Sequence, residues 1–206
     1  MAFDAGYWQQ DVHYTMNVTL MPETHEIKGI SHIVYVNNSP DSLDQIYMHL
    51  YPNAFQEGSV KYREYQQKYG RLGRIGSMLK DITPYEAGIS IHSFKISMGG
   101  NHFSESFEIE DTILEAVLPK SLSSDDSLVI EIEWTHHVGE QIERAGYVGD
   151  QYNAAQWYPK LVVYDENGWH NDPFHAEGEF YGEFGTFDVT LDLPEKYIVG
   201  ATGVVT

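Results

Sequence analysis

The sequence VHYTMNVTL at residues 12–20 alternates apolar and polar side chains without a break. Successive side chains of a β-strand point to opposite faces of the sheet, so this pattern predicts a strand with one buried and one solvated face. The residues expected on the buried face are Val12, Tyr14, Met16, Val18 and Leu20. The stretch therefore predicts a strand that packs on a core.

A second alternating stretch follows the turn-like residues 21–24, which read MPET. We expect Ile30, Val34 and Val36 to form the apolar face of this strand. Two alternating stretches joined by a short turn are typical of an antiparallel hairpin. The turn-forming residues NNSPD at 37–41 end the second strand.

Further strand patterns occur at residues 46–50, 90–96, 103–109, 112–118, 128–134 and 187–193. In the first of these, Ile46, Met48 and Leu50 are expected to point inward. About nine short strands separated by turn signals predict an all-β fold, a twisted antiparallel β-sandwich or saddle-like domain. The length fits one such domain, so we expect residues 1–206 to form a single unit.

Residues 60–80 break this pattern, because long polar side chains that tolerate a helix replace the alternation. The stretch predicts one helical or irregular excursion from the sheets. Half of the 12 basic residues lie in it, namely Lys61, Arg63, Lys68, Arg71, Arg74 and Lys80. Gly70, Gly73 and Gly76 do not match a phosphate-binding loop, so we interpret the stretch as a basic loop suited to an acidic partner or a second domain.

Charge and composition exclude several classes of function. The 31 acidic and 12 basic residues give a formal net charge of -19, which repels nucleic acid and anionic membranes. No stretch reaches the roughly 18 apolar residues of a membrane helix, and residues 1–10 lack the basic and apolar regions of a signal peptide. The chain contains no cysteine, so disulfides and thiolate metal sites are excluded.

Potential metal ligands gather in one short stretch, as His170, Asp172, His175, Glu177 and Glu179. Imidazole and carboxylate groups suit Zn²⁺ or Mn²⁺. Pro173 prevents a regular helix there, so a solvated loop is the favoured interpretation. His136 and His137, near Glu140, lack the His-Glu-x-x-His order and are expected on opposite faces of a strand end.

Other catalytic motifs are missing or unspecific. There is no Gly-x-Ser-x-Gly turn for a nucleophilic serine, and the many acidic residues single out no glycosidase pair. Asn17-Val18-Thr19 and Asn37-Asn38-Ser39 fit the glycosylation pattern, as short tripeptides often do by chance. We therefore expect no catalytic residue in this chain.

Two longer groups of residues carry a family resemblance. The first reads YTMNVTL at 14–20, HEIKG at 25–29, VYVNNSPDSL at 34–43 and YMHLYPN at 47–53. The second reads QWYPK at 156–160, VYD at 163–165, GWH at 168–170, DPF at 172–174 and EFYGEFGTFDV at 179–189. In order and spacing they closely resemble the N-terminal part of bacterial aminopeptidase N-like zinc metallopeptidases, the gluzincin aminopeptidase family. The resemblance extends from about Tyr7 to Gly203.

The resemblance implies an N-terminal β domain that packs on its own C-terminal catalytic domain. In the family, that second domain holds zinc through a His-Glu-x-x-His helix and a later glutamate, and none of these ligands is in this chain. The N-terminal domain forms one wall of the channel for peptide substrates, and by motif position Gln156 would hold the free amine of the peptide. A neutral amide oxygen accepts a hydrogen bond from an ammonium without the cost of burying a charge. We expect no metal ligand or cofactor within this chain, and no activity from it alone.

The chain also departs from the better-known members, which carry a compact Asp-Glu-Pro segment shortly after the glutamine. Here Asp172-Pro173 is followed by a stretch with Gly and Glu, and residues 60–80 add the basic excursion. These differences leave the substrate preference open. The compartment is open as well, with an exported parent protein, periplasmic or in the cell envelope, favoured. For Gln156 the structural alternative is a strand-end side chain bonded to backbone.

Two other functions stay open from the residues alone. A stand-alone β-sandwich module would bind carbohydrate or protein through exposed Tyr and Trp rings. A metal-dependent hydrolase would use the ligands at 170–179. A reading frame that continues past Thr206 into a His-Glu-x-x-His helix would favour the peptidase, and one that ends there would favour the alternatives.

Overall fold

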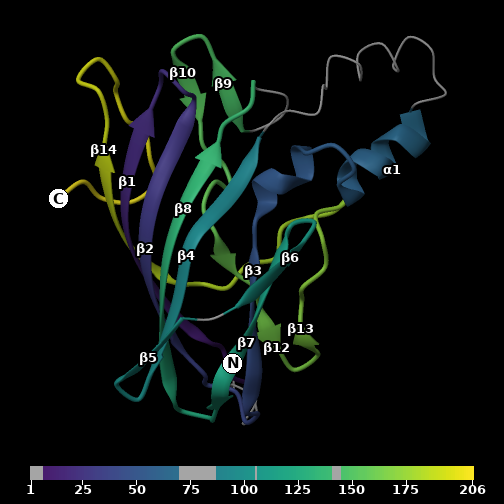
Figure 1. Cartoon of the computed structure of the whole chain (residues 1–206), viewed down its shortest axis with the longest axis vertical. Helices are drawn as coiled ribbons and strands as arrows, with labels where there is room; N and C mark the ends of the chain where they lie inside the picture. Colours follow the sequence, from purple (N-terminus) through teal and green to yellow (C-terminus); the bar gives the residue numbers. More distant parts are fainter. Residues whose placement is uncertain (1–6, 70–86, 105, 141–144) are drawn as a thin grey trace, which may run out of the picture.

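The structure is a computed structural model, and it describes residues 7–69, 87–104, 106–140 and 145–206. Its larger sheet has six strands in the order β14-β1-β2-β8-β4-β5. Their bounds are β1 Asp11–Met21, β2 Glu26–Val36, β4 Gly88–Met98, β5 Asn101–Ser104, β8 Ser127–His137 and β14 Thr186–Asp192. Figure 1 shows the four long strands β1, β2, β8 and β4 side by side.

The second sheet has four strands in the order β11-β3-β7-β6. Its strands are β3 Leu43–His49, β6 Phe107–Glu110, β7 Ile113–Leu122 and β11 Lys160–Leu161. Two short hairpins complete the strands, one from β9 Gly146–Val148 and β10 Gln151–Asn153, the other from β12 Tyr164–Asp165 and β13 Gly168–Trp169. The predicted all-β fold is confirmed.

One apolar core joins the two sheets. Met16 and Ile130 of the larger sheet belong to the same buried cluster as Ile46, Met48 and Leu114 of the second sheet. The alternation that predicted the strands thus marks the side chains that lie between the sheets. Leu50, which follows β3, is fully buried as expected.

The face predicted for β2 is wrong. Ile30 is 58% exposed, and the buried positions of the strand are instead Ile27, Gly29, Ser31, Ile33 and Tyr35. The reason is the Trp134 ring on the neighbouring strand β8. A Cβ at Gly29 would lie 2.1 Å from that ring, so only glycine fits. Ser31 Oγ accepts a hydrogen bond from Trp134 Nε1 at 3.0 Å.

A short 3-10 helix, η1 (Tyr51–Phe55), precedes the predicted excursion, whose first part is an α-helix, α1 (Val60–Tyr69). The helical alternative is therefore confirmed for residues 60–69. Arg71, Arg74 and Lys80, like Gly70, Gly73 and Gly76, lie outside the described residues. No helix in the described part of the chain is long and apolar enough to cross a membrane.

Two strands differ from the expectation. The pattern at 103–109 forms not one strand but two, because the chain leaves the larger sheet after β5 and enters the second sheet at β6. The strand β14 pairs with β1 in parallel, whereas an antiparallel sheet was predicted. All of its residues are exposed, since β14 forms the edge of the larger sheet.

Candidate functional site

A pocket of about 130 Å³ lies where η1, α1 and the end of β8 meet the segments around residues 155 and 174. We call it the Gln156 pocket. Its wall includes Phe55, Lys61, His136, Gln156, Phe174 and Phe180. Pockets lined by aromatic rings with a few polar groups are the usual form of small-ligand sites. Among these residues, Gln156 is the only one to which the sequence resemblance assigned a role in ligand binding.

Gln156 has a backbone φ of 53°. Four described residues other than glycine have positive φ, and the other three are His25, Asp111 and Asp125. His and Asp tolerate this left-handed region better than Gln does, and the conformation costs on the order of 1–3 kcal/mol. Strain of this kind is concentrated at functional sites, and here it lies on the pocket wall.

His136 lies at the end of β8 on the inner face, where it is 5% exposed. Burial lowers the pKa of His136 to about 4, with a smaller lowering by His137 and an opposing backbone hydrogen bond to Trp157. The ring is therefore neutral near pH 7. Within the described residues its Nδ1 has no hydrogen-bond partner. Most buried polar atoms of native proteins have one. A ligand with an N–H donor would satisfy it.

Lys61 lies in the first turn of α1 and is 3% exposed. Its Nζ is 4.2 Å from the centroid of the Phe55 ring and 4.5 Å from that of Phe174. An ammonium between aromatic faces is stabilised by cation–π attraction. Lysine is almost never this buried unless other groups stabilise its charge. The Phe55 and Phe174 rings and the Lys61 ammonium therefore pack together in the wall of the pocket.

The segment 172–180 is bonded to α1. The Glu64 carboxylate accepts a hydrogen bond from the Ala176 N–H at 2.8 Å and pairs with His175 Nδ1 at 2.7 Å. These contacts, the backbone one first, lower the pKa of Glu64. Lys68 pairs with Glu177. Helix and segment thus fix Phe174 and Phe180, whose rings stack with their centroids 5.0 Å apart.

The potential metal ligands at 170–179 do not converge. His170 pairs with Asp165 at 2.7 Å, whereas His175 and Glu177 turn toward Glu64 and Lys68 of α1. In the part of the chain that is described, no three His, Asp or Glu side chains are grouped so as to hold a metal ion. The solvated-loop interpretation fits these contacts better than a metal site.

The other candidates from the sequence have structural roles. His136 and His137 lie on opposite faces of β8, as predicted, and His137 pairs with Glu26 at 3.3 Å. Asn37 of the glycosylation tripeptide is fully buried, and its amide donates to the Leu122 and Asp41 carbonyls. It is a turn-stabilising residue and not a sugar acceptor.

The tryptophan rings, all of which lie among the described residues, do not form an open binding platform. Trp134 and Tyr35 are fully buried, and Trp8 stacks on Tyr164 with ring centroids 5.8 Å apart. Each tryptophan of the sequence is at least half-buried. The rings that were candidates for carbohydrate stacking therefore mostly serve the core.

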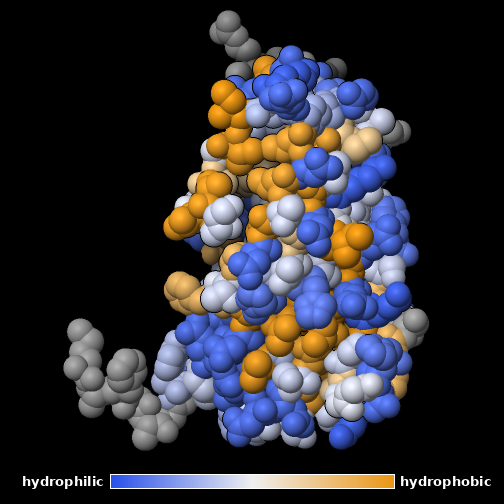
Figure 2. Space-filling model, turned by 90° about the vertical axis from the view of Figure 1, so that its left-hand side faces the viewer, coloured by the Kyte–Doolittle hydropathy of each residue, from blue (hydrophilic) through white to orange (hydrophobic). Residues whose placement is uncertain are grey.

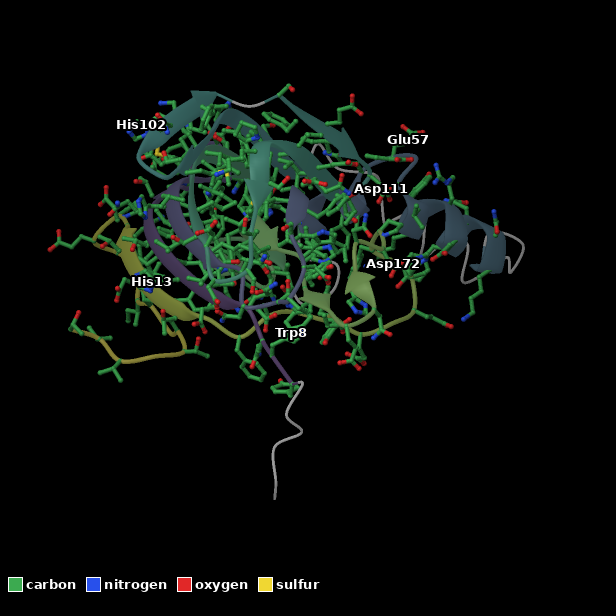
Figure 3. The ribbon with its side chains drawn as sticks, turned by 90° about the horizontal axis from the view of Figure 1, so that it is seen from below. Trp8, His13, Glu57, His102, Asp111 and Asp172 are labelled. Atoms are coloured by element: carbon green, nitrogen blue, oxygen red, sulfur yellow. The ribbon has the colours of Figure 1, made fainter. Side chains whose placement is uncertain are left out.

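A wider groove of about 580 Å³ is lined by acidic side chains, including Glu57, Glu108, Glu110, Asp111 and Glu115. Figure 3 shows Glu57, Asp111 and Asp172 on the side of the molecule where α1 lies, far from His13. Carboxylates on a surface are usually solvated, and we assign no ligand to this groove.

The C-terminal part exposes many apolar side chains. Phe184 is 80% exposed and Ile198 98% exposed, and Phe187, Val189 and Leu191 of β14 are open to solvent on one face. Figure 2 shows apolar side chains gathered on this side of the molecule, which we call the β14 face. Contiguous exposed apolar surface marks an interaction site more often than chance.

The fold was compared with those of known proteins. No family model matches the sequence, and no curated protein matches it. Solved structures do match. An M1 zinc metallopeptidase from Deinococcus radiodurans is matched over 98% of this chain and 36% of that chain, with a TM-score of 0.50 and 14% identity.

Two related structures match the chain over a similar share of its length. A mutant two-domain M1 zinc metallopeptidase bound to L-arginine is matched over 98% of this chain and 36% of that one, with a TM-score of 0.52 and 13% identity. A mutant of the Deinococcus radiodurans protein bound to a Tyr-Ser-Ala substrate is matched over 96% of this chain and 36% of that one, with a TM-score of 0.50 and 13% identity.

The chain therefore has the fold of one part of the M1 zinc metallopeptidases, and it spans 36% of the length of the structures it matches. At this identity the likeness concerns the fold. The fold that the sequence resemblance implied is confirmed.

Proposed function

We propose that this chain is the N-terminal domain of a zinc-dependent aminopeptidase and forms part of the channel that binds the amino end of a peptide. The match to about a third of larger M1 metallopeptidases supports the first half of the proposal. The observation that carries the second half is the strained Gln156 on the wall of an aromatic pocket. One matched structure binds a Tyr-Ser-Ala substrate, which is consistent with a peptide as ligand.

In this proposal the peptide's ammonium group donates to the Gln156 Oε1 atom. An amide oxygen is a good acceptor for this purpose because it needs no charge of its own to be buried. The neutral His136 ring supplies a second acceptor at Nδ1. Together they would position the first residue of the peptide.

The zinc chemistry belongs to the proposed catalytic domain. Across the described ranges no three His, Asp or Glu side chains are grouped so that they could hold a metal ion. In this proposal the chain contributes binding and shape, and is inactive by itself. The β14 face would pack on the catalytic domain, since its apolar side chains need a partner surface.

The test uses the natural full-length protein and aminoacyl p-nitroanilides. Loss of one hydrogen bond to a charged group costs roughly 1.5–3 kcal/mol, so Gln156→Ala is expected to lower kcat/KM about 10- to 100-fold. Gln151→Ala, which removes an exposed glutamine of β10, is the matched control and should change little. Wild-type activity in Gln156→Ala would remove Gln156 from the channel. Hydrolysis by the isolated chain would contradict its proposed inactivity.

The single-unit extent of residues 1–206 and the exported location of the parent stay predictions. The stand-alone binding module would be supported instead if the isolated chain bound a glycan or protein while the full-length protein cleaved no peptide.

A further inference from the structure

We propose that Glu64 of α1 is a positioning residue for the Gln156 pocket, because it holds segment 172–180 where the side chains of this segment complete the pocket wall. Glu64 itself lies outside the described wall, so it acts through the segment. The inference rests on the proposed function for the nature of the ligand. It adds a residue that sets the affinity for the amino end of a peptide without touching it.

Segment 172–180 has two sides with different neighbours. Its alternate residues line the Gln156 pocket, namely Phe174, Ala176, Gly178 and Phe180. Of the residues between them, His175 and Glu177 pair with Glu64 and Lys68 of α1. Figure 1 shows the chain passing beside α1 between β13 and β14. The contacts with the helix therefore decide where the pocket side of the segment lies.

Side chains hold this segment, since it belongs to neither a helix nor a strand. The Oγ1 atom of the fully buried Thr112 accepts a hydrogen bond from the Phe174 N–H at 2.8 Å. Glu64 Oε2 accepts one from the Ala176 N–H at 2.8 Å, and Glu64 Oε1 lies 2.7 Å from His175 Nδ1. Hydrogen bonds to an ionised group are roughly twice as strong as neutral ones. Both oxygens of one carboxylate thus tie two consecutive residues of the segment to α1.

The aromatic wall of the pocket depends on this attachment. The stacked Phe174 and Phe180 rings both contact the buried Tyr51 ring edge-on, with centroids 5.7 and 4.8 Å away. All three rings line the pocket. Between the two phenylalanines, Ala176 and Gly178 leave space, and a Cβ added at Gly178 would meet nothing within 4 Å. A shift of the segment would therefore move the rings and the open space together.

The attachment contributes little to the global fold but much to the position of the segment. The Glu64 and His175 side chains are 38% and 46% exposed, and exposed ion pairs add little to stability. Segments with few buried contacts open locally at a low cost in free energy. Loss of the Glu64 carboxylate should therefore free the segment while the two sheets stay folded. The expected consequence is weaker binding of the peptide and not slower chemistry.

The experiment measures kcat and KM of the full-length protein with Leu-p-nitroanilide. We expect Glu64→Ala to raise KM about tenfold and to change kcat less than about twofold, since an interaction that serves binding alone is lost. Glu64→Gln keeps an oxygen that accepts from the Ala176 N–H, and it should restore KM to within about threefold of wild type. Glu179→Ala, which removes an exposed carboxylate of the same segment, is the matched control and should leave KM unchanged.

Hydrogen–deuterium exchange gives a second readout that needs no activity. In full-length Glu64→Ala the amides of segment 172–180 should exchange faster than in wild type, whereas those of β2 and β8 should keep their protection. In Glu179→Ala the exchange of the segment should equal that of wild type.

The outcomes separate this inference from the proposed function. Unchanged exchange in Glu64→Ala, or faster exchange with an unchanged KM, would overturn the positioning role and leave the aminopeptidase proposal standing. Absence of hydrolysis of every aminoacyl substrate by wild type would overturn the aminopeptidase proposal and the effect on KM with it. Should Glu64→Ala fail to fold, Glu64→Asp withdraws the carboxylate by one methylene and should show the same rise in KM.

Discussion

Two histidines, His49 and His136, are buried in this fold, and burial lowers the pKa of each to about 4. In the unfolded chain a histidine binds its proton near pH 6.5. Between these values the unfolded state takes up protons that the folded state does not. The free energy of unfolding therefore decreases as the pH falls from about 6.5 toward 4, and it is fully retained above pH 6.5.

The size of this effect follows from the two pKa values. Each histidine should remove roughly 2 kcal/mol of stability between pH 7 and pH 5. Urea unfolding of the chain at both pH values measures it. His49→Phe, which keeps a ring to stack on Tyr51, should reduce the loss by about that amount. The exposed His32 replaced by Gln is the control. An equal acid sensitivity of His49→Phe and wild type would show that His49 is protonated in the fold.

Some residues of the candidate site could be predicted from the sequence, and others could not. Gln156 was predicted through the family resemblance, because it precedes a recognisable WYP turn. Lys61 and His136 were not predicted as its neighbours, since they come from positions far apart along the chain. The signal for Lys61 was its place in a basic stretch, but sequence does not show that two phenylalanine rings bury it. His136 was interpreted as a strand end, which is correct but omits its orphan nitrogen.

The strands themselves were predicted well wherever one face alone is apolar, as in β1 and β8. In β2 both faces carry apolar residues, with Ile30 and Val34 on one and Ile33 and Tyr35 on the other. Alternation alone cannot choose between such faces. The decisive signal was Gly29, whose missing side chain admits Trp134. The hairpins β9–β10 and β12–β13 escaped prediction because strands of two or three residues show no period.

The parallel neighbours β1 and β14 provide a test at the level of elements. Met16 and Val189 are partners in the register, but Met16 is buried and Val189 is 41% exposed. Met16→Ala should lower the free energy of unfolding by about 2–5 kcal/mol, whereas Val189→Ala should lower it by less than about 1 kcal/mol. Urea unfolding of both variants measures the difference. Equal losses in the free energy of unfolding would mean that another copy of the chain covers β14 in solution. In that case the loss for Val189→Ala should become smaller on dilution.

Charge acts on the molecule as a whole. The net charge of -19 disfavours a compact state through self-repulsion. It is also unevenly spread, since Glu108 of β6 lies directly opposite Glu115 of β7 beside the acidic groove. Like charges at such positions destabilise a sheet. The fold should therefore be more stable at higher ionic strength.

Thermal unfolding in 20 and 300 mM NaCl tests this expectation. Salt shortens the screening length to less than about 10 Å, and we expect Tm to rise by a few degrees, equivalent to roughly 1 kcal/mol. Glu108→Lys turns the repulsive pair into an attractive one and should raise Tm at low salt while reducing its salt dependence. A Tm that is constant or falls with NaCl would exclude self-repulsion as a factor in stability.

Because β14 pairs with β1, the sheet can be completed only late in synthesis, when β14 has been made. His13 and Thr186 are hydrogen-bonded across 173 residues of chain, and a ribosome adds about 5–20 residues per second. The free edge of β1 is therefore without its partner for roughly 10–35 seconds in every round of translation. An unpaired strand edge is a template for aggregation. The nascent chain would depend on chaperones during this interval, and its yield should respond to the rate of translation.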